Sequence, residues 1–186
     1  MESAAVILVA VGGSDQSMNT IAYLSRVLSP KKVAIEPFRV IAAAPDSFFD
    51  LGEIKETAGY EEEIGKWKSN RSSQIDRFMD EARTLLMHAG FSAGSISVTV
   101  QPRREGIARD IIIKSALDYA AVVIGRKGYG SLPDYVLGSI AAKLVDTITD
   151  VPLAIVGGQP ETRKFVVAFD RSRSIRKGLD RVSPLF

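Results

Sequence analysis

The chain has 186 residues, a length that fits one domain with room for an extension. Its 46% hydrophobic and 25% charged residues are ordinary for a globular protein, and a net charge of +2 gives no reason to expect a nucleic-acid partner. Because there is no cysteine, disulfides, thiol chemistry and cysteine-ligated zinc are excluded. No apolar run approaches the roughly 20 residues that span a bilayer, so a cytoplasmic protein without a membrane partner is expected.

Hydrophobic runs and helical periodicity alternate along the chain. Residues 6–11 form a near-continuous apolar run, typical of a strand buried on both faces, and Ser14 or Asp15 is expected to cap the next helix. Pro37 is expected at the start of a strand or on an edge-like position. Further strands are expected at residues 37–42, 95–100, 122–124 and 152–156, and helices at residues 17–28, 61–89, 106–119 and 136–149.

This alternation predicts a parallel, doubly wound α/β sheet. In such sheets ligands bind beyond the carboxyl ends of the strands. Two glycine turns are expected there, Gly12-Gly13 after the first strand and Gly125 after the fourth.

The second glycine turn opens a longer pattern, Gly-x2-Gly-x9-Gly-Ser, at Gly125, Gly128, Gly138 and Ser139. A strand that ends in glycines and leads into a helix start is suited to phosphate binding, because unpaired N–H groups point at the anion and glycines let it approach. The pattern is not a Walker A loop, since no Gly-Lys-Ser/Thr follows, and it is not a dinucleotide fingerprint, since Pro133 stands where the third glycine should be.

The spacing resembles the nucleotide signature of the universal stress protein family. The opening VILVAVGGSDQS and the later GSIAAKLVDTITDVPLAIVGG resemble the same family, over roughly residues 5–158. The resemblance implies a five-stranded parallel sheet of order 3-2-1-4-5, related to the Rossmann-like adenine-nucleotide α-hydrolase fold. It also implies a stress-response regulatory protein that binds an adenine nucleotide of the ATP class, with Mg²⁺ arriving only with the nucleotide.

By the same resemblance, the ligand is expected to contact the two glycine turns, the end of the second strand and the start of the fourth main helix. Val40 would pack by the adenine. Gly138, Ser139 and the backbone beyond them would hold the phosphates. The expected positions are Gly12, Val40, Gly125, Gly128, Gly138, Ser139, Ile140 and Ala141.

One position departs from the family pattern. After its first strand the family usually carries an aspartate that accepts a hydrogen bond from the nucleotide, and Gly12 stands there instead. Losing such a charged hydrogen bond weakens binding by about 1.5–3 kcal/mol. A nucleotide-free dimerisation or scaffold module, pairing through residues 153–156, is therefore the alternative.

Catalytic machinery is not evident in the sequence. His88 is the only histidine, so a Ser-His-Asp set cannot be assembled, and no metal cluster is recognisable. No catalytic or metal-binding residue is predicted, and slow ATP hydrolysis is the most that is expected. An ATP pyrophosphatase-type enzyme is a third hypothesis, disfavoured because its phosphate loop is missing after the first strand.

The end of the chain repeats its beginning. Val9-Ala10 matches Val167-Ala168, and Asp170 stands where Gly12 stands in the first copy. The sequence thus predicts a domain at residues 1–158, a linker at 159–164, and the first strand and helix of an incomplete second repeat at 165–186. A lone strand and helix cannot bury their apolar faces, so this tail is expected to dock on another surface. A homodimer through residues 153–156 and the tail is expected.

Overall fold

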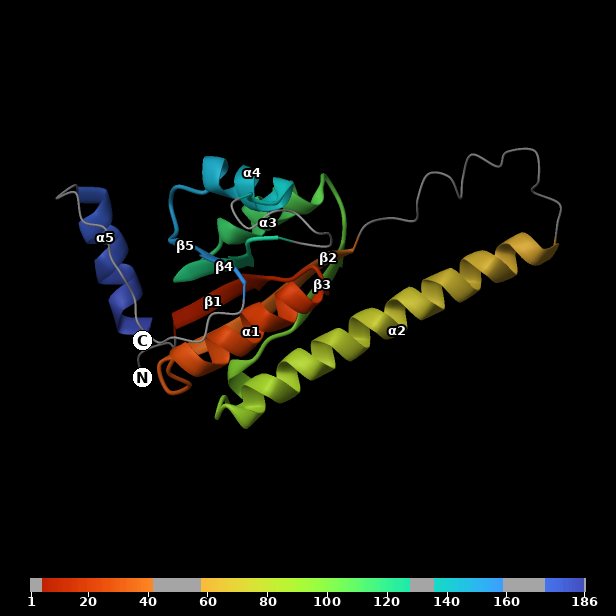
Figure 1. The fold of residues 1–186 in the computed structure, drawn as a ribbon, viewed down its shortest axis with the longest axis horizontal. Helices are drawn as coiled ribbons and strands as arrows, with labels where there is room; N and C mark the ends of the chain where they lie inside the picture. Colours follow the sequence, from red (N-terminus) through yellow and green to blue (C-terminus); the bar gives the residue numbers. More distant parts are fainter. Residues whose placement is uncertain (1–4, 42–57, 128–135, 159–172, 186) are drawn as a thin grey trace.

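A computed structural model describes residues 5–41, 58–127, 136–158 and 173–185. Its centre is one five-stranded parallel sheet with the strand order β3-β2-β1-β4-β5, which confirms the predicted fold and order (Figure 1). The strands are β1 (Ala5–Ala10), β2 (Val33–Ile41), β3 (Thr99–Pro102), β4 (Ala121–Gly125) and β5 (Leu153–Val156).

Helices cover both faces of the sheet (Figure 1). One face packs against α1 (Asp15–Val27) and the carboxyl-terminal half of α2 (Ala58–His88), and the other packs against α3 (Ile107–Ser115) and α4 (Ser139–Thr147). A short 3-10 helix, η2 (Ala93–Ser95), precedes β3, and α5 (Arg173–Val182) and η3 (Ser183–Leu185) end the described chain. None of the described helices is both long enough and apolar enough to cross a membrane.

The apolar run of β1 is buried on both faces, as predicted. Ile7 and Val9 belong to the core under α1 and α2, whereas Leu8 and Ala10 belong to the core under α3 and α4. Alternate residues of a strand point to opposite faces, so both layers are anchored on this central strand.

The position expected for Pro37 is wrong. It is the fifth residue of β2, which lies between β1 and β3 in the sheet. The carbonyl of Ile35 accepts from Ser97 on the β3 side, so the missing N–H of Pro37, two residues on, faces the same side. The ladder to β3 is interrupted there, and proline is tolerated because no strand bond is required of it.

The same interruption corrects the third strand, which was predicted at residues 95–100. Ile96 makes only an isolated bridge with Ile35, and the continuous ladder begins where Thr99 pairs with Phe38. The alternating apolar residues do indicate extended chain, but regular pairing between β2 and β3 begins only after Pro37.

The helix limits differ from the predicted ones by a few residues. The α1 helix begins at Asp15, and its cap is Ser14, one of the two residues that the sequence predicted for this position. The α3 helix ends at Ser115 because the chain turns at Ala116, and α4 begins only at Ser139 because Gly138 is still extended.

Within residues 165–186 the tail forms the predicted helix as α5, whereas the predicted strand before it lies outside the described residues. Leu185 is 3% exposed and joins the core under α1 and α2, and its carbonyl accepts from the N–H of Ser29 at 3.5 Å. Arg181 Nη1 donates to the carbonyl of Asp150 at 2.5 Å. Since Ser29 precedes β2 and Asp150 precedes β5, the tail packs at the amino ends of the strands, away from the glycine turns (Figure 1).

Candidate functional site

A cavity of about 270 Å³ lies at the carboxyl ends of β1, β2 and β4. It brings together seven of the eight positions expected from the sequence, and Gly128 lies outside the described residues. The seven that line it are Gly12, Val40, Gly125, Gly138, Ser139, Ile140 and Ala141.

The start of α4 forms one wall. The N–H of Gly138 donates to the carbonyl of Arg126 at 2.9 Å, which holds the start of α4 against the end of β4. The first helical bond runs from the N–H of Ala142 to the carbonyl of Gly138, and Gly138 has no side chain to cap the helix. The N–H groups of residues 139–141 therefore have no partner within the helix and are suited to an anion.

Little space is left for a side chain at Gly125. A Cβ placed there would meet Thr20 Oγ1 at 3.3 Å and Gln16 Cγ at 3.4 Å. The α1 helix thus approaches β4 closely at this point. Gln16 Nε2, on the same helix, donates hydrogen bonds to the carbonyls of Val156 and Gly158.

The turn after β1 forms another part of the lining. The N–H of Gly12 donates to Ser17 Oγ at 2.9 Å, and Ser17 also lines the cavity. Gly13 has a φ of +80° and the guanidinium of Arg39 lies against it, so a side chain there would strain the backbone and displace the Arg39 guanidinium. Ser17 was not among the residues expected from the sequence, where its only signal is the spacing Ser-x-x-Ser at 14 and 17.

Two basic residues, Arg126 and Lys127, line the cavity on the side of α4. The Arg126 side chain also lies against Gly157, where a Cβ would stand 2.7 Å from Nε. No aspartate or glutamate lines the cavity in the part of the chain that the structure describes, and no metal-binding group of His, Cys, Asp and Glu occurs there. This wall is accordingly positive.

The remaining wall is apolar and comes from Phe38, Val40, Ile107 and Ile111. Apolar lining of this kind suits a base or another aromatic ring. Seen together, the walls offer an apolar end near β2 and a cationic, N–H-rich end near α4.

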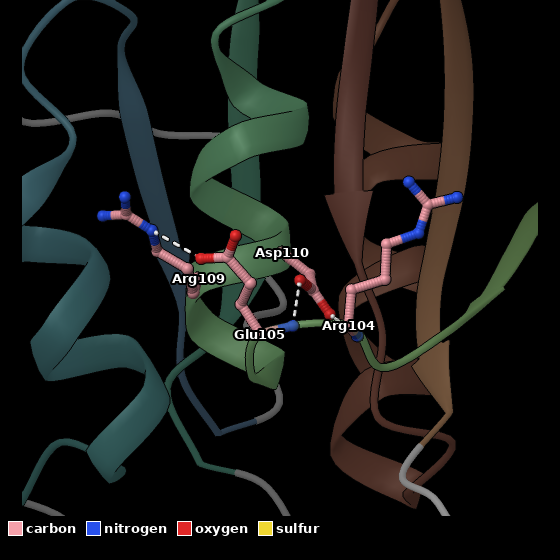
Figure 2. A network of polar contacts seen from close by, with 4 residues as sticks. All are labelled: Arg104, Glu105, Arg109 and Asp110. Atoms are coloured by element: carbon pink, nitrogen blue, oxygen red, sulfur yellow. Dashed lines mark hydrogen bonds and ion pairs between the residues drawn. The ribbon is translucent and has the colours of Figure 1, made fainter.

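Asp110 fixes the loop that leads into the apolar wall (Figure 2). Its side chain is 2% exposed; Oδ2 accepts from the N–H of Arg104 at 2.8 Å and Oδ1 from that of Glu105 at 3.1 Å. Burial acts to raise the pKa of Asp110, but the backbone N–H groups of residues 104–106 and the charge of Arg104 outweigh it and hold the pKa below its usual value. In Figure 2 the Arg104 and Arg109 side chains extend to opposite sides of this anchor, and Arg109 pairs with Glu105 at 3.4 Å.

A second polar cluster, formed by Glu36, Lys114 and Tyr119, lies beside the ring of Phe38. Glu36 Oε1 is 2.9 Å from Lys114 Nζ, and Tyr119 donates to Glu36 Oε2 at 2.7 Å. Burial acts to raise the pKa of Glu36, but hydrogen bonds from Thr99, Tyr119 and Lys114 outweigh it and lower the pKa. Lys114 Nζ also lies 5.7 Å from the centre of the Phe38 ring, so this group supports a cavity-lining side chain.

The family model described as "Universal stress protein family" matches residues 5–157. The chain belongs to the universal stress protein family. Among solved structures, it is similar to the universal stress protein UspA from Lactobacillus plantarum, with 15% identity, a TM-score of 0.58, and coverage of 82% of this chain and 96% of the other. A family protein from Burkholderia pseudomallei gives 16% identity, a TM-score of 0.56 and coverage of 84% and 98%.

A universal stress protein solved in complex with cAMP is also similar, with 15% identity, a TM-score of 0.51 and coverage of 83% of this chain and 98% of the other. At these identities the likeness to solved structures shows the fold. No curated protein matches the chain in sequence.

Proposed function

We propose that this universal stress protein binds an adenine nucleotide of the ATP class in the cavity and acts in the cytoplasm as a stress-response regulator. The observation that carries the proposal is the pairing of an open α4 amino terminus at Ser139 with an apolar wall at Val40 in one cavity. A structurally similar family member binds cAMP, which supports an adenine ligand.

The two ends of the cavity match the two ends of a nucleotide. The phosphates fit the α4 N–H groups, where the helix dipole favours negative charge, and Arg126 and Lys127 add positive charge. The adenine fits between Val40, Phe38 and the first turn of α3.

Turnover is not the proposed output. The residues that face the cavity are proposed to bind and orient the nucleotide, with slow ATP hydrolysis at most. Mg²⁺ would enter on the phosphates, since the described lining supplies backbone N–H groups and cations rather than carboxylates.

The first test is to denature protein purified from its host and identify any nucleotide that it releases. The second is to titrate nucleotide-free protein with ATP by calorimetry. Released adenine nucleotide, or saturable binding of ATP, is expected. No released nucleotide together with no binding at millimolar ATP would overturn the proposal.

A nucleotide-free dimerisation module is the second candidate, because β5 is an edge strand. The carbonyls of Pro152 and Val156 face β4, so the N–H of Ile155 faces away from β4, and in the described residues no strand pairs with it on that side. The tail at residues 165–186 is a further candidate for this contact, although its described part packs against the same chain. Ile155→Pro should lower the dimer fraction in light scattering, and Ile155→Ala, which keeps the N–H, should not.

A further inference from the structure

Ser17 lines the cavity, and its hydroxyl makes hydrogen-bond contacts with two neighbouring residues. Its side chain is 6% exposed. The N–H of Gly12 donates to its Oγ at 2.9 Å, and Ser14 Oγ lies 3.3 Å away. Ser14 Oγ in turn accepts from the N–H of Ser17 at 3.4 Å, as the cap of α1.

These contacts limit the directions in which the hydroxyl of Ser17 can donate. A serine hydroxyl has one hydrogen to donate and two lone pairs. The contact between Ser14 Oγ and Ser17 Oγ can run in either direction, and when Ser14 donates, both lone pairs of Ser17 are used. The hydrogen of Ser17 then faces the cavity, and a ligand acceptor would favour this orientation because both hydroxyls donate in it. Ser17 can therefore donate into the cavity when an acceptor is bound there.

We infer that Ser17 is a specificity-determining residue that donates a hydrogen bond to an acceptor atom of the bound nucleoside, an inference that rests on the nucleotide binding proposed above. The usual aspartate acceptor of the family is replaced by Gly12, and the adjacent Ser17 presents a donor. The polarity of this wall is thereby reversed.

The acceptor belongs to the nucleoside because of where β1 lies. It stands between β2, which carries Val40, and β4, which leads to Arg126, Lys127 and α4. With the phosphates at α4 and the adenine at Val40, the atoms facing Ser17 are ring nitrogens or ribose oxygens.

The experiment measures affinity by calorimetry for ATP and for analogues that each lack one group. The 1-, 3- and 7-deaza analogues each remove one ring acceptor, the 2′- and 3′-deoxy analogues each remove one hydroxyl, and purine riboside triphosphate removes the amino donor. The proteins are wild type, Ser17→Ala, Ser17→Thr and Ser25→Ala, the last removing a hydroxyl that bonds to the Ala22 carbonyl on the same helix.

One acceptor deletion is expected to weaken binding to the wild type by about 2- to 13-fold, the range for a single neutral hydrogen bond. The same deletion should change binding to Ser17→Ala by less than about twofold, and Ser17→Thr and Ser25→Ala should behave as the wild type. Melting temperatures of all four proteins separate lost folding from lost recognition.

Two results would overturn the inference while leaving nucleotide binding intact. In one, every analogue loses the same factor in the wild type and in Ser17→Ala. In the other, the loss coupled to Ser17 is that of the amino group, which is a donor. Absence of ATP binding to the wild type would instead overturn the proposed function itself.

Discussion

The N–H of Gly138 donates to the carbonyl oxygen of Arg126 at 2.9 Å, and this bond holds the amino end of α4 beside the carboxyl end of β4. It brings the open N–H groups of α4 and the two basic residues that follow β4 to one end of the cavity. Binding at this end should therefore depend on ligand charge.

Lys127→Ala should weaken ATP binding by about 3- to 10-fold and AMP binding by a smaller factor, because the lost charge acts on more phosphate charge in ATP. Calorimetry with ATP, ADP and AMP measures this gradient. Lys143→Ala is the control, because Lys143 is exposed on α4 and does not line the cavity. Equal losses for all three nucleotides would contradict a phosphate contact at Lys127.

Gly12→Asp should tighten ATP binding, by about tenfold. The φ of Gly12 is not positive, and a Cβ there would have Ser17 Oγ as its nearest neighbour at 3.7 Å, so a Cβ is accommodated without strain. The new carboxylate would take the Ser17 hydrogen and lose a neutral bond of about 0.5–1.5 kcal/mol, but it would gain a charged bond of about 1.5–3 kcal/mol to a ligand donor.

The control for this variant is Gly12→Asn, which has the same shape without the charge. It should tighten binding less than Gly12→Asp does. Unchanged or weaker ATP affinity in Gly12→Asp, measured by calorimetry on folded protein, would count against the placement of Gly12 at the ligand.

Asp110→Asn should lower the free energy of unfolding by about 2–3 kcal/mol. Asp110 is buried and accepts from the N–H groups of Arg104 and Glu105, and the amide of asparagine would turn a donor toward one of them. Urea unfolding measures the loss. Glu105→Gln, which removes only an exposed pairing with Arg109, is the control and should change stability by less than about 0.5 kcal/mol.

The pH dependence of the same variant follows from the lowered pKa of Asp110. A carboxyl group whose folded pKa lies below its unfolded value stabilises the fold above the unfolded value, near pH 4, and this stabilisation is lost as the pH falls through the folded value. The wild type should therefore lose more stability than Asp110→Asn between about pH 5 and pH 2. Parallel stability curves for the two proteins would show that Asp110 is not the group responsible.

The sequence predicts the sheet and the rim of the site well, because both depend on patterns that are local. Apolar runs locate β1, β4 and β5, and the spacing of Gly125, Gly138 and Ser139 requires a strand, a loop and a helix start in that order. The start of β3 could not be predicted, because it depends on which side of β2 the N–H of Pro37 faces, and that is a property of the assembled register.

Buried polar partners were missed for a similar reason. Ser17 and Asp110 are polar residues within helices, and their sequence neighbours do not indicate that they are buried. Their roles appear only when Gly12 and the loop at Arg104 come within hydrogen-bond distance. Hydrogen bonds between residues five or six apart at helix entries are the signal to look for in related chains.

The tail should stabilise the domain from the side opposite the cavity. Leu185 is 3% exposed in the core under α1 and α2, so Leu185→Ala should lower the free energy of unfolding by about 2–3 kcal/mol. Arg181→Ala, which removes only an exposed bond to the carbonyl of Asp150, should lower it by less than about 1 kcal/mol.

A chain that is cut after Pro160 should melt at a lower temperature than the full chain. Its ATP affinity should stay within about twofold of that of the full chain, because the tail contacts the amino ends of the strands and the ligand is proposed to bind at their carboxyl ends. An unchanged melting temperature and oligomeric state after the cut would show that the tail does not dock.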